Sequence, residues 1–193
     1  MKKVIFLFSC LLFTLLFSAT AQKRDIFYFR FGGNIFFSGN KEKGPFFFPA
    51  LSFAPGIRIV QSKDFALVLA APISIGSSFR SSNSSYLGID APATLEFNFG
   101  SAAGNNENSH FGFILGAGAG YHYAGNYADT YTDPFSDFRH FDFWGYRLES
   151  GFTFGKEGNG SQVMILFNYG RGFTAEKRTM IGAGLVFTMG NIK

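Results

Sequence analysis

The chain has 193 residues, among them 28 Phe and 24 Gly, while only 16% of the residues are charged and only one is Cys. This composition excludes a disordered chain and does not fit an ordinary soluble domain. Lys2 and Lys3 contribute two of the four net positive charges, and the remainder is too small to indicate a nucleic-acid partner.

The N-terminal segment has the features of a secretory signal peptide. Lys2 and Lys3 precede an uncharged apolar stretch, Val4 to Phe17, and Ala19-x-Ala21 supplies the small residues of a cleavage site. The stretch is shorter than the ~20 residues that a spanning helix needs, so we expect a cleaved signal peptide at 1–21. An uncleaved anchor is the alternative. Because Cys10 lies inside this segment, we expect neither a disulfide nor a thiol site in the exported domain, 22–193.

Eight runs in the rest of the chain alternate large apolar residues with small or polar ones. This period of two predicts strands, and runs of ten residues or more suit a tilted strand that crosses the ~25 Å apolar band of an outer-membrane barrel. We therefore predict an all-β fold, an eight-stranded antiparallel up-and-down transmembrane β-barrel. The predicted strands are Phe27 to Ser38, Ala50 to Gln61, Phe65 to Phe79, Tyr86 to Phe99, Phe111 to Tyr123, Trp144 to Phe154, Gln162 to Arg171 and Thr179 to Met189.

The charged residues within these runs lie on the opposite parity from the large apolar residues, except Arg171, which lies on the outward parity at a strand end, where it can reach the head groups. Since successive strand residues point to opposite faces, the apolar set would contact lipid and the charged set would face the lumen. Unpaired ions in a dry interior are costly, so we expect arginines and acids to pair. The expected lumen network is Arg30, Arg58, Asp90, Glu96, His122, Arg147 and Glu149.

The lengths of the connections between the predicted strands indicate which end of the barrel faces the outside. An even strand count places both termini on one side, and outer-membrane barrels keep their longer loops outside. The longest connection, Ala124 to Phe143, is odd-numbered and hence external. Outward aromatic residues next to it would form an interface girdle, namely Tyr121, Tyr123, Trp144 and Tyr146.

The long external loop mixes aromatic residues with acids. The acids lack the spacing of a calcium loop, so we expect no metal site. Aromatic side chains among acids can bind a glycan, lipopolysaccharide or a protein, and simple packing over the barrel mouth is the alternative. The aromatic residues of this loop are Tyr127, Tyr131, Phe135, Phe138 and Phe141.

The signal peptide, the eight alternating runs and the final run Met180-x-Gly182-x-x-Leu185-x-Phe187 resemble the small outer-membrane β-barrel proteins of Gram-negative bacteria, the OmpA/OmpX-like and PorT-like barrels. The resemblance implies an integral outer-membrane location, with bilayer lipid and lipopolysaccharide as surroundings. It also implies that the barrel-assembly machinery reads the last strand. It implies little about function, because this fold hosts adhesins, enzymes and inert anchors.

We expect a lumen closed by side chains, and a structural or interaction protein that acts through its external loops. A narrow gated channel is the first alternative. A lipid-modifying enzyme is the second, although Tyr123 and Ala124 follow His122, and the Ser and Asn of the His-x-Ser-Asn motif of lipid A deacylase barrels are missing. A soluble lipocalin-like barrel is a further rival. We expect no catalytic residues and no cofactor.

Overall fold

The computed structural model describes residues 26–40, 44–81, 84–103, 109–128, 140–155, 161–173 and 178–189. Within these ranges no helix is long and apolar enough to cross a membrane. A 3-10 turn, Ser101–Ala103, follows β5. The strands are β1 (Phe27–Asn40), β2 (Gly44–Gln61), β3 (Phe65–Ala70), β4 (Ile73–Ser81), β5 (Ser84–Gly100), β6 (Phe111–Ala128), β7 (His140–Phe154), β8 (Ser161–Gly172) and β9 (Thr179–Met189).

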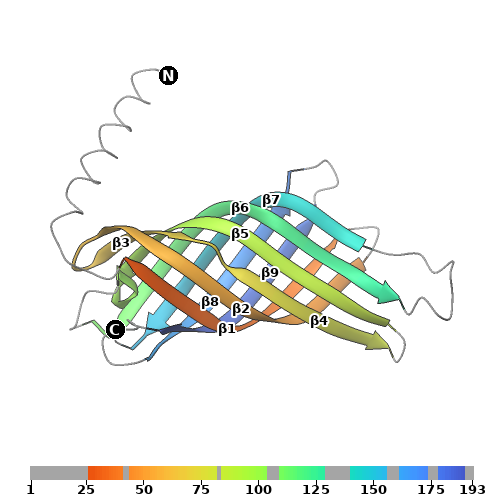
Figure 1. The fold of residues 1–193 in the computed structure, drawn as a ribbon, viewed down its shortest axis with the longest axis horizontal. Coiled ribbons are helices and arrows are strands. Elements are labelled where there is room, and N and C mark those ends of the chain that lie inside the picture. The colour runs from red at the N-terminus through yellow and green to blue at the C-terminus, as the bar shows by residue number, and fades with distance from the viewer. Residues whose placement is uncertain are drawn as a thin grey trace, which may run out of the picture.

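The strands form one closed antiparallel barrel (Figure 1). Strands adjacent in sequence pair with each other, except β3 and β4, and β1 closes the ring by pairing with β9. Because β3 and β4 share the position between β2 and β5, the ring has eight strand positions. The predicted fold is confirmed. We call the end where β1 begins and β9 ends the terminal end, and the end where β6 stops and β7 starts the far end.

The third predicted strand is interrupted, and β3 ends before Ala71 and Pro72. Pairing with β5 stops at Ala70, opposite Thr94, and resumes at Ser74, opposite Asp90. Pro72 has no N–H to donate to a ladder, which accounts for the break. Ladder bonding is restored at the edge of the gap, where the Ala71 N–H donates to the Pro55 carbonyl at 3.0 Å.

Several strands continue further toward the far end than the sequence pattern predicted. β2 starts at Gly44 instead of Ala50, β6 continues to Ala128, and β7 starts at His140. The segment added to β2 contains Pro45 and Pro49. The ladder between β2 and β4 begins only at Ala50, so these prolines lie in a segment that pairs with β1 alone, where a missing N–H is tolerated.

Burial alternates along the strands with the predicted parity. The outer wall exposes large apolar side chains, such as Leu51 at 79% and Trp144 at 63%, whereas inward Glu96 is 0% exposed. This distribution is the reverse of a soluble barrel, which keeps its apolar residues inside.

Large inward side chains lie beside glycines of the neighbouring strands. Tyr28 is paired with Gly56, Asn34 with Gly184, Phe36 with Gly182, and Glu149 with Gly116. A Cβ at Gly116 would lie 2.5 Å from Glu149 Cγ, far closer than real contacts. The glycine-rich inward face therefore gives a narrow barrel the space for its few large residues.

Candidate functional site

Arg30 of β1 and Glu96 of β5 form an ion pair in the lumen, in the half nearer the terminal end. Both side chains are buried, at 2% and 0% exposure. The Tyr28 hydroxyl donates to Glu96 Oε2 at 3.2 Å, and the guanidinium carbons of Arg30 and Arg58 lie 5.2 and 5.1 Å from the centre of the Tyr28 ring. Pairing and cation–π contacts offset the cost of burying these charges.

Glu149 of β7 lies next to the Arg30–Glu96 ion pair. Glu96 and Glu149 are both register partners of Gly116, one from each side of β6. The Thr94 hydroxyl donates to Glu149 Oε1 at 3.5 Å, and within the part of the chain that the structure describes Glu149 forms no ion pair. The sequence led us to expect an arginine for each acid, whereas the structure places two carboxyl groups as neighbours.

A second polar cluster lies nearer the far end. Arg147 Nη1 donates to Asp90 Oδ2 at 2.6 Å, and His122 Nδ1 lies 3.6 Å from Asp90 Oδ1. On its other side, His122 Nε2 is 3.1 Å from Ser38 Oγ. The rings of Phe36, Phe48 and Phe143 surround the imidazole with centroid distances of 6.4, 5.9 and 5.2 Å. Aromatic rings thus surround the imidazole in a series of neighbouring polar side chains, which runs from Ser38 through His122 and Asp90 to Arg147.

The order Ser38–His122–Asp90 matches the connectivity of a serine hydrolase, but its geometry supports a packing role. The 3.6 Å separation exceeds hydrogen-bond length, so Asp90 does not orient the imidazole as a hydrolase carboxylate does. Asp90 is instead bonded to Arg147. Ser38 and His122 are each 2% exposed, so a substrate could not reach the hydroxyl in this conformation.

Two small voids lie in the lumen beside the two clusters. One void touches Asp90, His122 and Arg147, and another touches Tyr28, Arg30 and Arg58. Each has a volume of about 10 Å³, which is roughly that of one water molecule. Within the described ranges, no cluster of three or more His, Cys, Asp and Glu residues is placed to hold a metal ion.

The four residues of the expected girdle lie on the outer wall, toward the far end of β6 and β7. Tyr121 and Trp144 are register partners with ring centroids 5.5 Å apart, and the Tyr121 hydroxyl donates to Asp142 Oδ2 at 3.5 Å. Tyr123 and Tyr146 are half-buried on the same face. Amphipathic aromatic residues at this height suit the boundary between hydrocarbon and head groups.

The expected external loop, Ala124 to Phe143, is shorter in the structure because its two ends belong to strands. Tyr127 lies in β6 opposite Ser85, and Phe141 lies in β7 opposite Ala124. Tyr131, Phe135 and Phe138 lie outside the described residues. Between the strand ends, residues 129–139 therefore constitute the connection.

Sequence reasoning did not single out three residues of this region. Tyr28 and Ser38 lie on the inward parity of β1, together with Arg30, so parity could have identified them. Arg178, just before β9, forms an ion pair with Asp142 at 3.5 Å and also donates to the Asp142 carbonyl. No sequence pattern links Arg178 to Asp142, because Arg178 precedes β9 and Asp142 lies at the start of β7, and only the pairing of β8 with both strands brings the two residues together.

Comparison with known proteins identifies the fold. No family model matches the chain, and no curated protein matches it by sequence. Neisserial surface protein A aligns with a TM-score of 0.63 at 10% identity, over 86% of this chain and 98% of that one. Ail, the attachment invasion locus protein of Yersinia pestis, aligns with a TM-score of 0.53 at 10% identity, over 84% and 97%. The chain has the fold of the small outer-membrane β-barrels.

A second structure of Ail is a complex with the heparin analogue sucrose octasulfate. It aligns with a TM-score of 0.54 at 10% identity, over 84% of this chain and 97% of that one. At this level of identity the likeness extends to architecture and not to individual residues.

Proposed function

We propose that the protein is an integral outer-membrane barrel with a closed lumen, which acts as a structural or interaction protein through its external loops. The observation that carries the proposal is the contrast between the two walls. Exposed Phe and Leu side chains cover the outside, while ion pairs and aromatic rings fill the inside. This arrangement suits a protein embedded in lipid that does not pass solutes.

Cell fractionation tests the location. We expect the protein in the outer-membrane fraction, extractable only with detergent, with a gel mobility that changes on heating. Recovery from the periplasm without detergent would support a soluble lipocalin-like barrel instead. Cleavage of residues 1–21 is part of the proposal, and these residues lie outside the described part of the chain. Sequencing the N-terminus of the purified protein should start at Gln22.

The external surface is the region that we propose to bind a partner. Both polar clusters are enclosed in the lumen, so their groups are not available to a macromolecule. The connection at 129–139 combines Tyr131, Phe135 and Phe138 with three aspartates, and such a surface can bind a sugar ring or a protein. The complex of Ail with a heparin analogue supports a glycan as one class of partner for a barrel of this shape.

A loop exchange tests this proposal. Residues 129–139 are replaced by Asn-Gly, which leaves β6 and β7 complete, and intact outer membranes are then used for pull-down. Loss of a specific partner, glycan or lipopolysaccharide would support the proposal. The matched control removes 104–108 from the connection between β5 and β6 at the terminal end, and we expect it to retain the partner. The same binding by both variants would contradict an external site at 129–139.

A narrow gated channel is the second candidate, and the position of Glu149 favours it. Glu149 and Glu96 flank Gly116, so Arg30 could exchange Glu96 for Glu149 without leaving the lumen. Such an exchange would move the Arg30 side chain within the lumen and open a path for ions. Steady single-channel currents in planar bilayers, abolished by Glu96→Gln or Arg147→Gln, would favour the channel over the closed barrel.

A further inference from the structure

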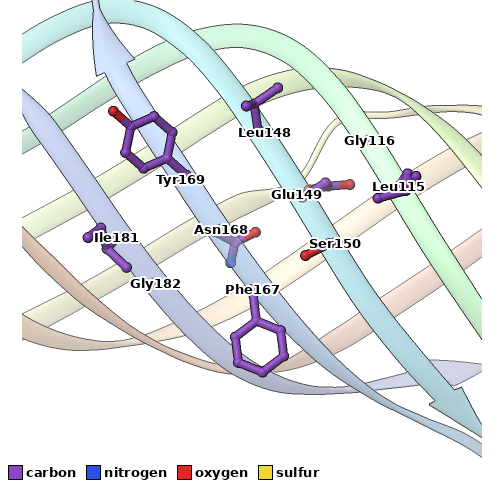
Figure 2. Close-up of a pocket in the computed structure, with 10 residues that line it drawn as sticks. All are labelled: Leu115, Gly116, Leu148, Glu149, Ser150, Phe167, Asn168, Tyr169, Ile181 and Gly182. Atoms are coloured by element: carbon purple, nitrogen blue, oxygen red, sulfur yellow. The ribbon is translucent and has the colours of Figure 1, made fainter.

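Water can reach the polar clusters of the lumen only through the two ends of the barrel, because the wall between the ends is apolar on its outside. The outer wall has a depression of about 440 Å³ over β7, and Leu148, Phe167 and Tyr169 stand around it (Figure 2). Its floor is the ladder of β6 to β9, which is continuous along the row Gly116, Glu149, Asn168 and Gly182. The depression therefore does not lead into the lumen.

Aromatic side chains close the lumen near the far end. Phe36, Phe48 and Phe143 come from β1, β2 and β7, and each is 5% exposed or less. Together with Met180 they belong to one buried cluster, and their rings surround His122.

The terminal end is closed by a different element, the 3-10 turn Ser101–Ala103 (Figure 1). Connections between strands usually run over the surface, yet the three residues of this turn are 5% exposed or less. Ala103 belongs to the same buried cluster as Tyr28 of β1, and Ala102 belongs to a cluster with Met164 of β8. The turn thus fills the mouth of the barrel.

Side chains from both sides of the ring hold the turn in place. Gln61 of β2 donates from Nε2 to the Ala103 carbonyl at 2.9 Å. Gln162 of β8 donates from Nε2 to the Ser101 carbonyl at 2.7 Å, and Ser101 Oγ lies 2.8 Å from Thr153 Oγ1 of β7. Because the turn follows β5 and is bonded to β2, β7 and β8, it extends across the lumen.

Two glycines allow the chain to enter the mouth. Gly100, the last residue of β5, has a φ of 62°, a backbone conformation that favours glycine. A Cβ at Gly112 would lie 2.4 Å from the Ala102 nitrogen, so only glycine leaves room for the turn at this position of β6.

The turn lies directly against the polar cluster of the terminal half. The void beside this cluster is bounded by Ala102 and Gln162 on one side, and by Tyr28, Arg30 and Arg58 on the other. Its volume of about 10 Å³ has room for roughly one water molecule.

We propose that Ser101–Ala103 is a stopper, a closure of the lumen at the terminal end that opens independently of the aromatic closure near the far end. The stopper keeps water from the Arg30–Glu96 pair, while the aromatic rings protect the Asp90–Arg147 pair. The inference rests on the closed lumen of the proposed function and names the element that closes one end. Release of the stopper alone should admit water to the terminal half without opening a continuous path.

Cysteine labelling tests the stopper, because residues 22–193 contain no cysteine. Val68→Cys is the probe behind the stopper, since Val68 is 0% exposed and lies in the same cluster as Ala103. Met180→Cys, at a position that is 1% exposed, is the probe in the far-end cluster. The refolded domain in micelles is treated with a small charged thiosulfonate. This reagent modifies a buried cysteine only when the lumen opens, so the labelling rate follows the population of the open form.

Gln61→Met and Gln162→Met remove the donors that hold the turn and nearly preserve side-chain length. Each should accelerate labelling of Val68→Cys about fivefold, and both together about 30-fold, the effect of one and of two hydrogen bonds. Labelling of Met180→Cys should not change. The matched control is Ser109→Ala, which removes a 2.7 Å hydrogen bond to the Phe111 carbonyl in the same connection, outside the turn. It should leave both rates unchanged.

Heat-modifiable gel mobility confirms that each variant has folded, so faster labelling is not a lost barrel. Unchanged labelling of Val68→Cys in the double glutamine variant would overturn the stopper and leave the closed lumen intact. Rapid labelling of both probes without the glutamine changes would overturn the closed lumen itself, and the stopper with it. Equal acceleration at Val68→Cys and Met180→Cys would overturn the independence of the two closures.

Discussion

The inner and outer walls of this barrel follow different packing rules. Inside, large side chains lie against glycines of neighbouring strands, and two ion pairs are enclosed within a narrow lumen. Outside, Phe and Leu side chains project with few constraints, and many are about half exposed. The inner wall therefore depends on shape and charge complementarity, whereas the outer wall needs only to remain apolar.

Breaking the Arg30–Glu96 pair should have the largest effect. Arg30→Met leaves the Glu96 carboxylate buried without its ion-pair partner, and we expect a loss of about 3–5 kcal/mol in the free energy of unfolding. Urea unfolding in lipid vesicles, followed by Trp144 fluorescence, measures it. The double variant Arg30→Met/Glu96→Leu removes both charges and should recover most of the loss. Equal destabilisation by the single and double variants would mean that volume, and not charge, determines the packing at this site.

An arginine introduced on the outer wall should have the next largest effect on the free energy of unfolding. The size of this effect should depend on the depth of the residue in the bilayer. Leu51 lies near the middle of β2, and Leu51→Arg should cost about 2–4 kcal/mol because the cation enters hydrocarbon. Phe27 is at the start of β1, at the terminal end, and Phe27→Arg should cost only about 0–1 kcal/mol. The same unfolding assay compares them. Equal costs at the two positions would argue against a lipid-facing band.

Replacing a glycine by alanine should destabilise the inner wall more than the outer wall, with a smaller effect than the charge changes above. Gly116→Ala places a methyl group against Glu149 and should cost about 1–3 kcal/mol. Gly33 faces outward, where an added Cβ would meet only the Ala50 carbonyl at 3.9 Å, so Gly33→Ala should change stability by no more than about 0.5 kcal/mol. A similar loss for both would show that backbone effects of glycine, and not the crowding of the lumen, determine the outcome.

The sequence predicted most of the architecture because the alternation of apolar with small or polar residues can be recognised within each strand alone. Arg30, Asp90 and Glu149 could each be assigned to the inward face from their immediate neighbours. The same alternation located the strands to within a few residues at most of their ends. The structure differs from the predicted strands near Pro49, where β2 starts earlier, and at Pro72, where the third predicted strand is interrupted. The effect of a missing N–H depends on which neighbour strand is present, and the sequence of one strand does not show this.

The contacts inside the lumen were less predictable. Which arginine meets which acid depends on strand stagger and on the closure of the ring, and neither can be read from one strand. For this reason the proximity of Ser38 and His122, 84 residues apart, was not foreseen. The neighbouring carboxyl groups of Glu96 and Glu149 were missed for the same reason.

Spin labelling along β8 tests the central claim most directly, that one wall faces lipid and the other a closed lumen. Because Cys10 is the only cysteine of the chain, single cysteines can be introduced into 22–193 without background. Labels at 162 to 167 report collision with oxygen, which concentrates in hydrocarbon, and with a water-soluble nickel chelate. We predict high oxygen accessibility at Val163, Ile165 and Phe167, and low accessibility to both reagents at Gln162, Met164 and Leu166. High nickel accessibility at the outward positions, or the absence of alternation, would contradict the account.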